Sequence, residues 1–96
     1  MFIVSMYGEV ASEMMFGEVL GAYRHSSDAF RKVQTYNDVS EMREMCGETM
    51  HRESMLQDMF VSEDGKCVYE ETRRYTNDSC DVSATLVFNI TEVDVK

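Results

Sequence analysis

The chain has 96 residues, of which 44% are apolar and 28% charged, the composition of an ordinary globular domain. Eighteen acidic residues against nine basic ones give a net charge of −9, which disfavours direct binding to nucleic acids and anionic membranes. No apolar stretch approaches the ~20 residues that a membrane-spanning helix needs, and the amino terminus lacks the basic region of a signal peptide. We therefore expect one cytoplasmic domain over residues 1–96.

The first quarter of the chain contains a near-repeat, MYGEV at residues 6–10 and MFGEV at 15–19. Residues 2–10 alternate in polarity with period two, which predicts a strand. The apolar side chains of the second copy instead have the spacing of one helical stripe: Met15, Phe16, Val19, Leu20 and Tyr23. Residues 11–14 also lack the Gly, Asn or Pro of a tight turn. We expect a helix over about 13–25, with a β-hairpin as the alternative.

Two further helices are expected. One follows Ser26 and Ser27 over about 27–37. The other begins after the D-x-x-E pattern of Asp38 to Glu41, which is typical of a capping box, and extends over about 39–61, with Gly47 as a potential break. Its apolar stripe consists of Val39, Met42, Met45, Cys46, Thr49, Met50, Leu56 and Phe60.

The last third of the chain is expected to form two strands, over about 67–75 and 82–93, paired as an antiparallel hairpin. Together with residues 2–10 they predict an α+β fold, a small three-stranded antiparallel sheet with two or three helices packed on one face. The pattern leaves open whether the second face is covered. If it is exposed, it forms an apolar patch with Ile3, Tyr7, Val68 and Val87.

Catalytic and metal-binding patterns are weak. Cys46, Cys67 and Cys80 include no C-x-x-C pair, and with His51 they lack the close ligand spacing of structural zinc sites. Cys46 and His51 would face different ways on one helix. The residues around Ser26, Ser27 and Asp28 include no nucleophile elbow. We expect a non-enzymatic protein with no metal and no cofactor.

The strongest functional signal is an acidic row on the expected third helix. Glu41, Glu44 and Glu48 are spaced i, i+3 and i+7, so neighbouring carboxylates lie about 5–6 Å apart, close to the phosphate spacing of a nucleic-acid strand. Met55 and Met59 continue this face. These five residues are the predicted partner-binding site, suited to a basic protein surface. In size and charge the chain is similar to a class of viral proteins, the phage-encoded inhibitors that mimic the phosphate backbone. Such inhibitors occupy the nucleic-acid-binding cleft of a host protein.

Two other functions stay open. Gly17 and Gly21, four apart on the expected first helix, would form a self-interface in a homo-oligomeric structural protein. In a variant of this hypothesis the oligomer sequesters a small anionic ligand, held by Arg73 and Arg74 or by a second basic set: Arg24, Arg31 and Lys32. A thiol or metal-dependent enzyme based on Cys46 and His51 is the least favoured.

Overall fold

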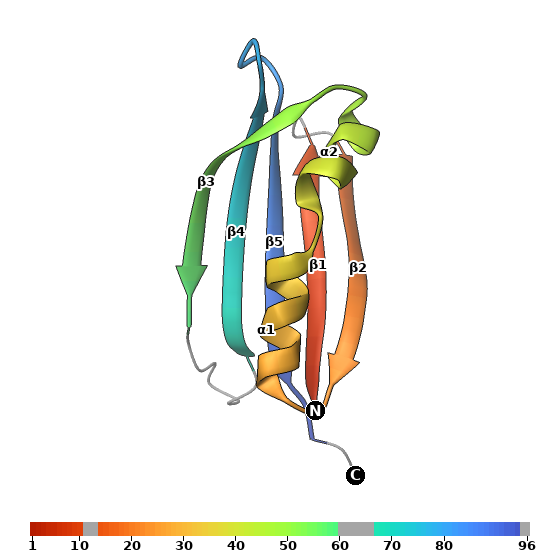
Figure 1. The fold of residues 1–96 in the computed structure, drawn as a ribbon, viewed down its shortest axis with the longest axis vertical. Helices are drawn as coiled ribbons and strands as arrows, with labels where there is room; N and C mark the ends of the chain where they lie inside the picture. The colour runs from red at the N-terminus through yellow and green to blue at the C-terminus, as the bar shows by residue number, and fades with distance from the viewer. Residues whose placement is uncertain (11–13, 60–66, 95–96) are drawn as a thin grey trace.

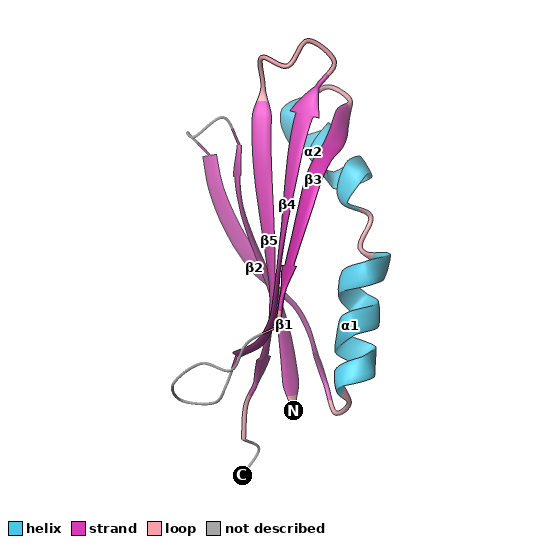
Figure 2. Cartoon of the chain, turned by 90° about the vertical axis from the view of Figure 1, so that its left-hand side faces the viewer, coloured by secondary structure: helices cyan, strands magenta, loops and turns pink. Residues whose placement is uncertain are grey.

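The computed structural model describes residues 1–10, 14–59 and 67–94. Its elements are β1 (Phe2–Val10), β2 (Met14–Tyr23), α1 (Ser26–Thr35), α2 (Asp38–Cys46), β3 (Met50–Asp58), β4 (Cys67–Asn77) and β5 (Ser83–Glu92). The five strands form one antiparallel sheet in the order β2-β1-β5-β4-β3 (Figure 1). Both helices lie on the same face of this sheet (Figure 2).

The expected three-stranded sheet is wrong, because the described residues form a sheet of five strands, with two helices on one of its faces. The two additional strands, β2 and β3, lie in segments for which the pattern predicted helix. Strands β1, β4 and β5 and helix α1 occupy the segments expected for them, and none of their ends is shifted by more than two residues. The predicted antiparallel hairpin is the β4–β5 pair.

The expected helix over 13–25 is the strand β2, so the hairpin alternative was the correct one. Val4 pairs with Gly21 and Ser5 with Val19, which leaves Leu20 as an extra residue in β2. Such a bulge interrupts the alternation of side chains between the two faces of a strand. Leu20 and Tyr23, three residues apart, therefore both pack against the core, and exposed Val19 adds an apolar residue on the other face, so that the pattern imitates a helical stripe.

The expected helix over 39–61 ends at Cys46. Gly47 follows it in the left-handed conformation, with φ 73°, and its N–H bonds to the carbonyl of Arg43, as in a common helix C-terminus. The chain then turns back to form β3 at the edge of the sheet. Of the nine residues of β3 only Met50 is buried. An exposed edge strand has no alternating apolar pattern, so period two gave no signal here.

The core lies between the helices and the middle of the sheet. The facing side chains of β1 and β5 include Val4, Met6, Leu86, Phe88 and Ile90, all buried. Helix α1 adds Ala29 and Val33, and α2 adds Met42. Aromatic edges complete the packing, with Phe30 against Tyr69 at 4.9 Å and Tyr36 against Phe88 at 5.4 Å between ring centroids.

No described element covers the second face of the sheet (Figure 2). Tyr7 is exposed there, whereas Ile3 is half-buried and Val87 is buried between its neighbours. Val68 does not share this patch, because it is half-buried against the core beside a bulge in β4. Neither described helix is long and apolar enough to cross a membrane.

Candidate partner-binding groove

A network of buried charges lies under the helices, where β4 presents Glu71, Arg73 and Tyr75 to the core. Arg73 donates to Glu71 through Nε and to the carbonyl oxygen of Val33 in α1, through Nη2 at 2.9 Å. Its guanidinium carbon lies 4.4 Å from the centre of the Phe88 ring. One arginine thereby joins the sheet to α1.

Asp38, the first residue of α2, is the second buried carboxylate of this network. Its Oδ2 accepts hydrogen bonds from the Tyr75 hydroxyl and from Arg52 Nη2, the latter at 2.8 Å. Arg73 Nη1 lies 3.2 Å from the same oxygen, an ion pair without hydrogen-bond geometry. Burial by itself raises the pKa of Asp38, but the bonds from Tyr75 and Arg52 and the charge of Arg73 outweigh it, so this pKa is lowered.

Glu71, the other buried carboxylate, also has a lowered pKa that results from hydrogen bonds and a nearby cation. Burial by itself raises its pKa, but hydrogen bonds from Gln57 and Tyr69 and the charge of Arg73 lower it below the ordinary value. The two neutral donors lie 2.9 and 2.6 Å from Oε1. Burial and the bond to Glu71 raise the pKa of Tyr69 to about 12, so this phenol remains a donor at neutral pH.

The network fixes the start of α2. The predicted capping box is not formed by the Asp38 side chain as N-cap, since the N-cap position is Asn37 and makes no side-chain bond. Asp38 Oδ1 accepts from the N–H of Val39, at 3.0 Å, while Oδ2 faces the arginines. Strands β3 and β4 thus hold the amino end of α2 against the sheet, and this orients the residues that follow.

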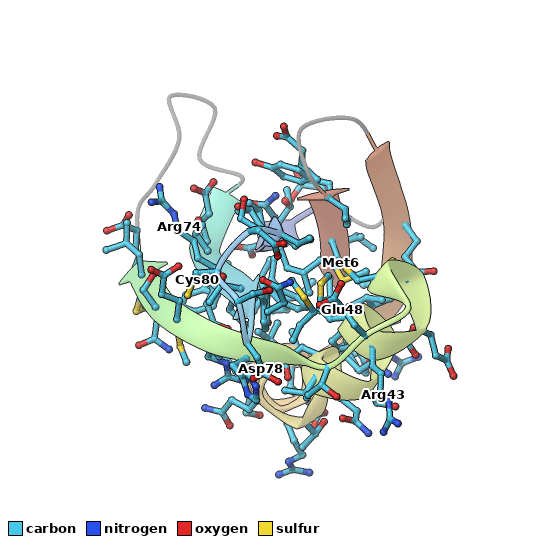
Figure 3. The ribbon with its side chains drawn as sticks, turned by 90° about the horizontal axis from the view of Figure 1, so that it is seen from above. Met6, Arg43, Glu48, Arg74, Asp78 and Cys80 are labelled. Atoms are coloured by element: carbon cyan, nitrogen blue, oxygen red, sulfur yellow. The ribbon has the colours of Figure 1, made fainter. Side chains whose placement is uncertain are left out.

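The held helix forms one wall of a groove against β2, here called the α2/β2 groove. Its lining residues are Met6, Gly17, Glu18, Tyr36, Glu41 and Met45. Met6 lies between the sheet and α2 (Figure 3). Glu18 and Glu41 therefore share a recess whose other walls are two methionines and a tyrosine.

The two groove carboxylates help to raise the pKa of Tyr36, which lines the same groove. The pKa of Tyr36 is raised to about 12, first by burial and then by the charges of Glu41 and Glu18. Neither glutamate makes an ion pair or a side-chain hydrogen bond within the described part of the chain. The groove therefore carries two uncompensated negative charges above a partly apolar floor, which can accept an ammonium or guanidinium group with its aliphatic stem.

The predicted five-residue site is not one helix face. Glu41 and Glu44 lie on α2, Glu48 lies beyond its end, and Met55 and Met59 lie on β3 and just after it. Glu48 accepts a 2.7 Å bond from Asn77 Nδ2, which ties this connection to the β4–β5 turn. Only Glu41 and Glu44 remain together, and the structure adds Glu18, which the pattern did not single out.

Gly17 and Gly21 lie on β2 rather than on a helix, so their predicted close helix contact is wrong in its geometry. A Cβ at Gly17 would lie 3.4 Å from the Met6 carbonyl oxygen, and one at Gly21 would lie 2.7 Å from the Tyr23 hydroxyl. Gly21 thus leaves room for the Tyr23 ring, whereas a Cβ at Gly17 would make only an ordinary contact.

The basic residues proposed to hold an anion are separated. Arg73 is buried, whereas Arg74 is exposed and lies on the side of the sheet away from the helices (Figure 3). Arg31 and Lys32 line a recess with Tyr23, while Arg31 also lies 4.0 Å from Asp28. This recess does not include Arg24 among its lining residues.

The thiols and histidines are also dispersed. Cys46 ends α2, Cys80 lies exposed in the β4–β5 turn, and His51 on β3 contacts Asp78 at 2.5 Å. Among the described residues no three His, Cys, Asp or Glu side chains are grouped to hold a metal ion. Cys67 was considered with these residues as a zinc ligand and rejected on spacing, and its side chain lies outside the described residues.

No protein-family model, curated protein sequence or solved structure matches the chain. A functional conclusion must therefore come from the residues themselves. The sequence could have pointed to the buried network, because Tyr69, Glu71, Arg73 and Tyr75 alternate on one face of β4. Glu18 carried no such signal, since it reaches α2 through its pairing with Met6 in the β1–β2 hairpin, in a segment for which the pattern predicted a helix.

Proposed function

We propose that this chain is a non-enzymatic, acidic protein-binding module, and that the α2/β2 groove docks on a basic surface of a partner protein. The observation that carries the proposal is the pair Glu18 and Glu41, which face one recess where no described residue places a cation. Arg52 and Arg73, by contrast, are engaged by Asp38 and Glu71. The groove carboxylates are thus free to bind a charge from outside.

The lining of the groove suits a lysine or arginine side chain. Methionine adapts its shape to an aliphatic stem, so Met6 and Met45 provide apolar contact. The two carboxylates receive the charged head, and Glu44 on the exposed side of α2 extends the negative field that steers a basic partner. The most specific form of the proposal is an inhibitor that occupies a nucleic-acid-binding surface in place of phosphates.

The test is retention of partners from bacterial lysate on immobilised protein, at low salt and at about 0.5 M salt, where screening removes surface electrostatics. The decisive comparison uses two double variants with the same net charge. Glu18→Gln/Glu41→Gln alters the groove, and Glu53→Gln/Glu92→Gln removes two exposed carboxylates elsewhere. A basic nucleic-acid-binding protein should be retained by the wild type and the second variant, but not by the first.

A retained protein should also be released when duplex DNA is added, because both would occupy the same surface. Equal loss of binding in the two variants would show that only total charge matters. Retention of nothing at low salt, or retention that is unaffected in the groove variant, would contradict the proposal.

A further inference from the structure

The two helices pack on different parts of the sheet. Helix α1 lies against β1, β2 and β5, whereas α2 lies mainly against β3. Arg52 in β3 also donates to Asp38 at the start of α2. Residues 38–58 therefore form one structural unit, here called the α2–β3 unit. In Figure 1 this unit crosses the sheet, from α2 on the β2 side to β3 at the opposite edge.

The α2–β3 unit contributes few buried side chains to the fold. In its helix only Asp38 and Met42 are buried, and in its strand only Met50 is. Its other links to the rest of the chain are polar, namely the pairing of β3 with β4 and side-chain hydrogen bonds to β4. Bonds to water replace such links when a unit opens, so they hold it less firmly than apolar burial would.

The part of the chain that the unit would leave behind has a core of its own. Strands β1 and β5 and helix α1 supply most of the buried apolar side chains. Arg73 keeps its bonds to Glu71 and to the Val33 carbonyl without any residue of the unit. Asp38 in turn leaves with Arg52 as its partner. Opening therefore separates no charge from its last partner, which would be costly.

The walls of the α2/β2 groove lie on both sides of this division. Glu41 and Met45 belong to the α2–β3 unit, whereas Met6, Gly17 and Glu18 belong to β1 and β2. The groove is therefore complete only while the unit is closed. Closure brings the carboxylates of Glu18 and Glu41 to one recess, where like charges repel each other. A cation between them would favour closure, because a ligand shifts an equilibrium toward the state that it binds better.

We propose that the α2–β3 unit opens from the rest of the fold as one piece, and that a cationic side chain entering the α2/β2 groove closes it. The choice of a cationic ligand rests on the proposed function. Segments that bind ligands are commonly drawn from the less stable part of a fold, and the burial described above places that part at α2 and β3. The groove is then completed by the partner that occupies it.

Native-state amide hydrogen exchange of the full chain, resolved by residue with NMR, tests the opening. The hydrogen-bonded amides of α2 and those of β3 that pair with β4 should report one common opening equilibrium. They should exchange at least about tenfold faster than the central amides of β1 and β5, which open only on global unfolding.

The role of the groove charges is tested with Glu18→Gln, which removes the repulsion from outside the unit. Exchange of α2 and β3 should become about twofold to fivefold slower, the range expected of an exposed charge pair. Glu9→Gln is the matched control, because Glu9 on β1 is also exposed and loses the same charge, and it should leave these rates unchanged. An acetylated tri-lysine peptide should slow the same amides in the wild type and have less effect in Glu18→Gln.

Exchange of α2 and β3 as slow as that of β1 and β5, or opening of one without the other, would overturn the proposal. So would an equal response to Glu18→Gln and Glu9→Gln, or a peptide without effect on the wild type. A partner retained from lysate that does not slow exchange of α2 and β3 would contradict this inference alone. Absence of any retained partner would contradict the proposed function, while the exchange rates would still decide whether the unit opens and closes.

Discussion

Replacing Arg73 by methionine tests how the buried network supports the fold. Methionine keeps an aliphatic side chain beneath α1 but removes the cation shared by Asp38 and Glu71 and the bond to Val33. Removing one partner of a buried ion pair costs about 3–5 kcal/mol. We expect the lower end, about 3 kcal/mol, because Tyr75, Arg52, Tyr69 and Gln57 still donate to the two carboxylates.

The dependence of this loss on pH gives the sharper test. In the wild type the pKa values of Asp38 and Glu71 are lowered, so the network stabilises the fold above their unfolded-state values of 3.8 and 4.5. That contribution is lost as the pH falls through the lowered values. In Arg73→Met the burial of Glu71 is no longer offset by the cation, so its pKa should rise and protonation should relieve an unpaired charge. The difference between wild type and variant should therefore shrink as the solution is acidified.

The assay is urea unfolding followed by circular dichroism, at neutral pH and at a pH near the ordinary value of the Glu71 carboxyl. Arg31→Met is the matched control, because the exposed pair of Arg31 with Asp28 at 4.0 Å is worth only about 0–1 kcal/mol. The double variant Arg73→Met/Glu71→Leu should recover part of the loss, since it leaves one charge fewer unpaired. A loss below about 1 kcal/mol for Arg73→Met at neutral pH, or one that does not change with pH, would refute the reasoning.

Three further outcomes are expected. Gly47→Ala should lower the free energy of unfolding by about 1–2 kcal/mol in urea titrations, and Gly47→Asn should lower it less. Since no described atom lies within 4 Å of the added Cβ, the loss comes from the positive φ of this position. An unchanged stability would contradict this. In absorbance titrations Tyr36→Phe should remove a tyrosinate component at about pH 12, and a titration curve unchanged by the substitution would argue against the raised pKa. The raised pKa values of Tyr36, Tyr69 and Tyr75 favour the protonated folded state, so the stability of the fold should fall as the pH rises above 10. Iodoacetamide at mildly alkaline pH should modify exposed Cys80 at least about fivefold faster than half-buried Cys46, because burial and Glu48 raise the pKa of the Cys46 thiol. Site mapping by mass spectrometry measures the two rates, and equal rates would contradict this difference between the thiols.

The sequence predicted those elements whose apolar side chains recur without interruption, with period two in a strand or with the helical period in a helix. Strands β1 and β5 have one buried and one less buried face, and this produces a clear period of two. Strand β2 was misread because the extra residue Leu20 shifts the phase of the residues after it, and because exposed Val19 places an apolar side chain on the other face. Strand β3 was misread because it has no buried face, and because only residues 47–49 separate it from α2, which ends where Gly47 adopts the left-handed conformation.

The candidate site was predictable only in part. The acidic character of α2 is local, so Glu41 and Glu44 could be recognised from their spacing. Glu18 joins them through the pairing of β1 with β2 and the packing of α2, which are long-range contacts. Asp38 resembled a helix cap in the sequence. Its burial depends on two arginines that lie far away in sequence, on strands β3 and β4.

The position of β5 has a consequence for how the chain acquires its fold. The last of the five described strands in chain order, β5, lies at the centre of the sheet between β1 and β4, and it pairs Phe2 with Glu92 and Val10 with Ala84. Until β5 emerges, the β1–β2 hairpin and the β3–β4 hairpin have no common hydrogen-bonding partner. Contacts between such distant parts of a chain make folding slow. We expect the nascent chain to become resistant to proteases in a single late step, once β5 is free to join the two halves.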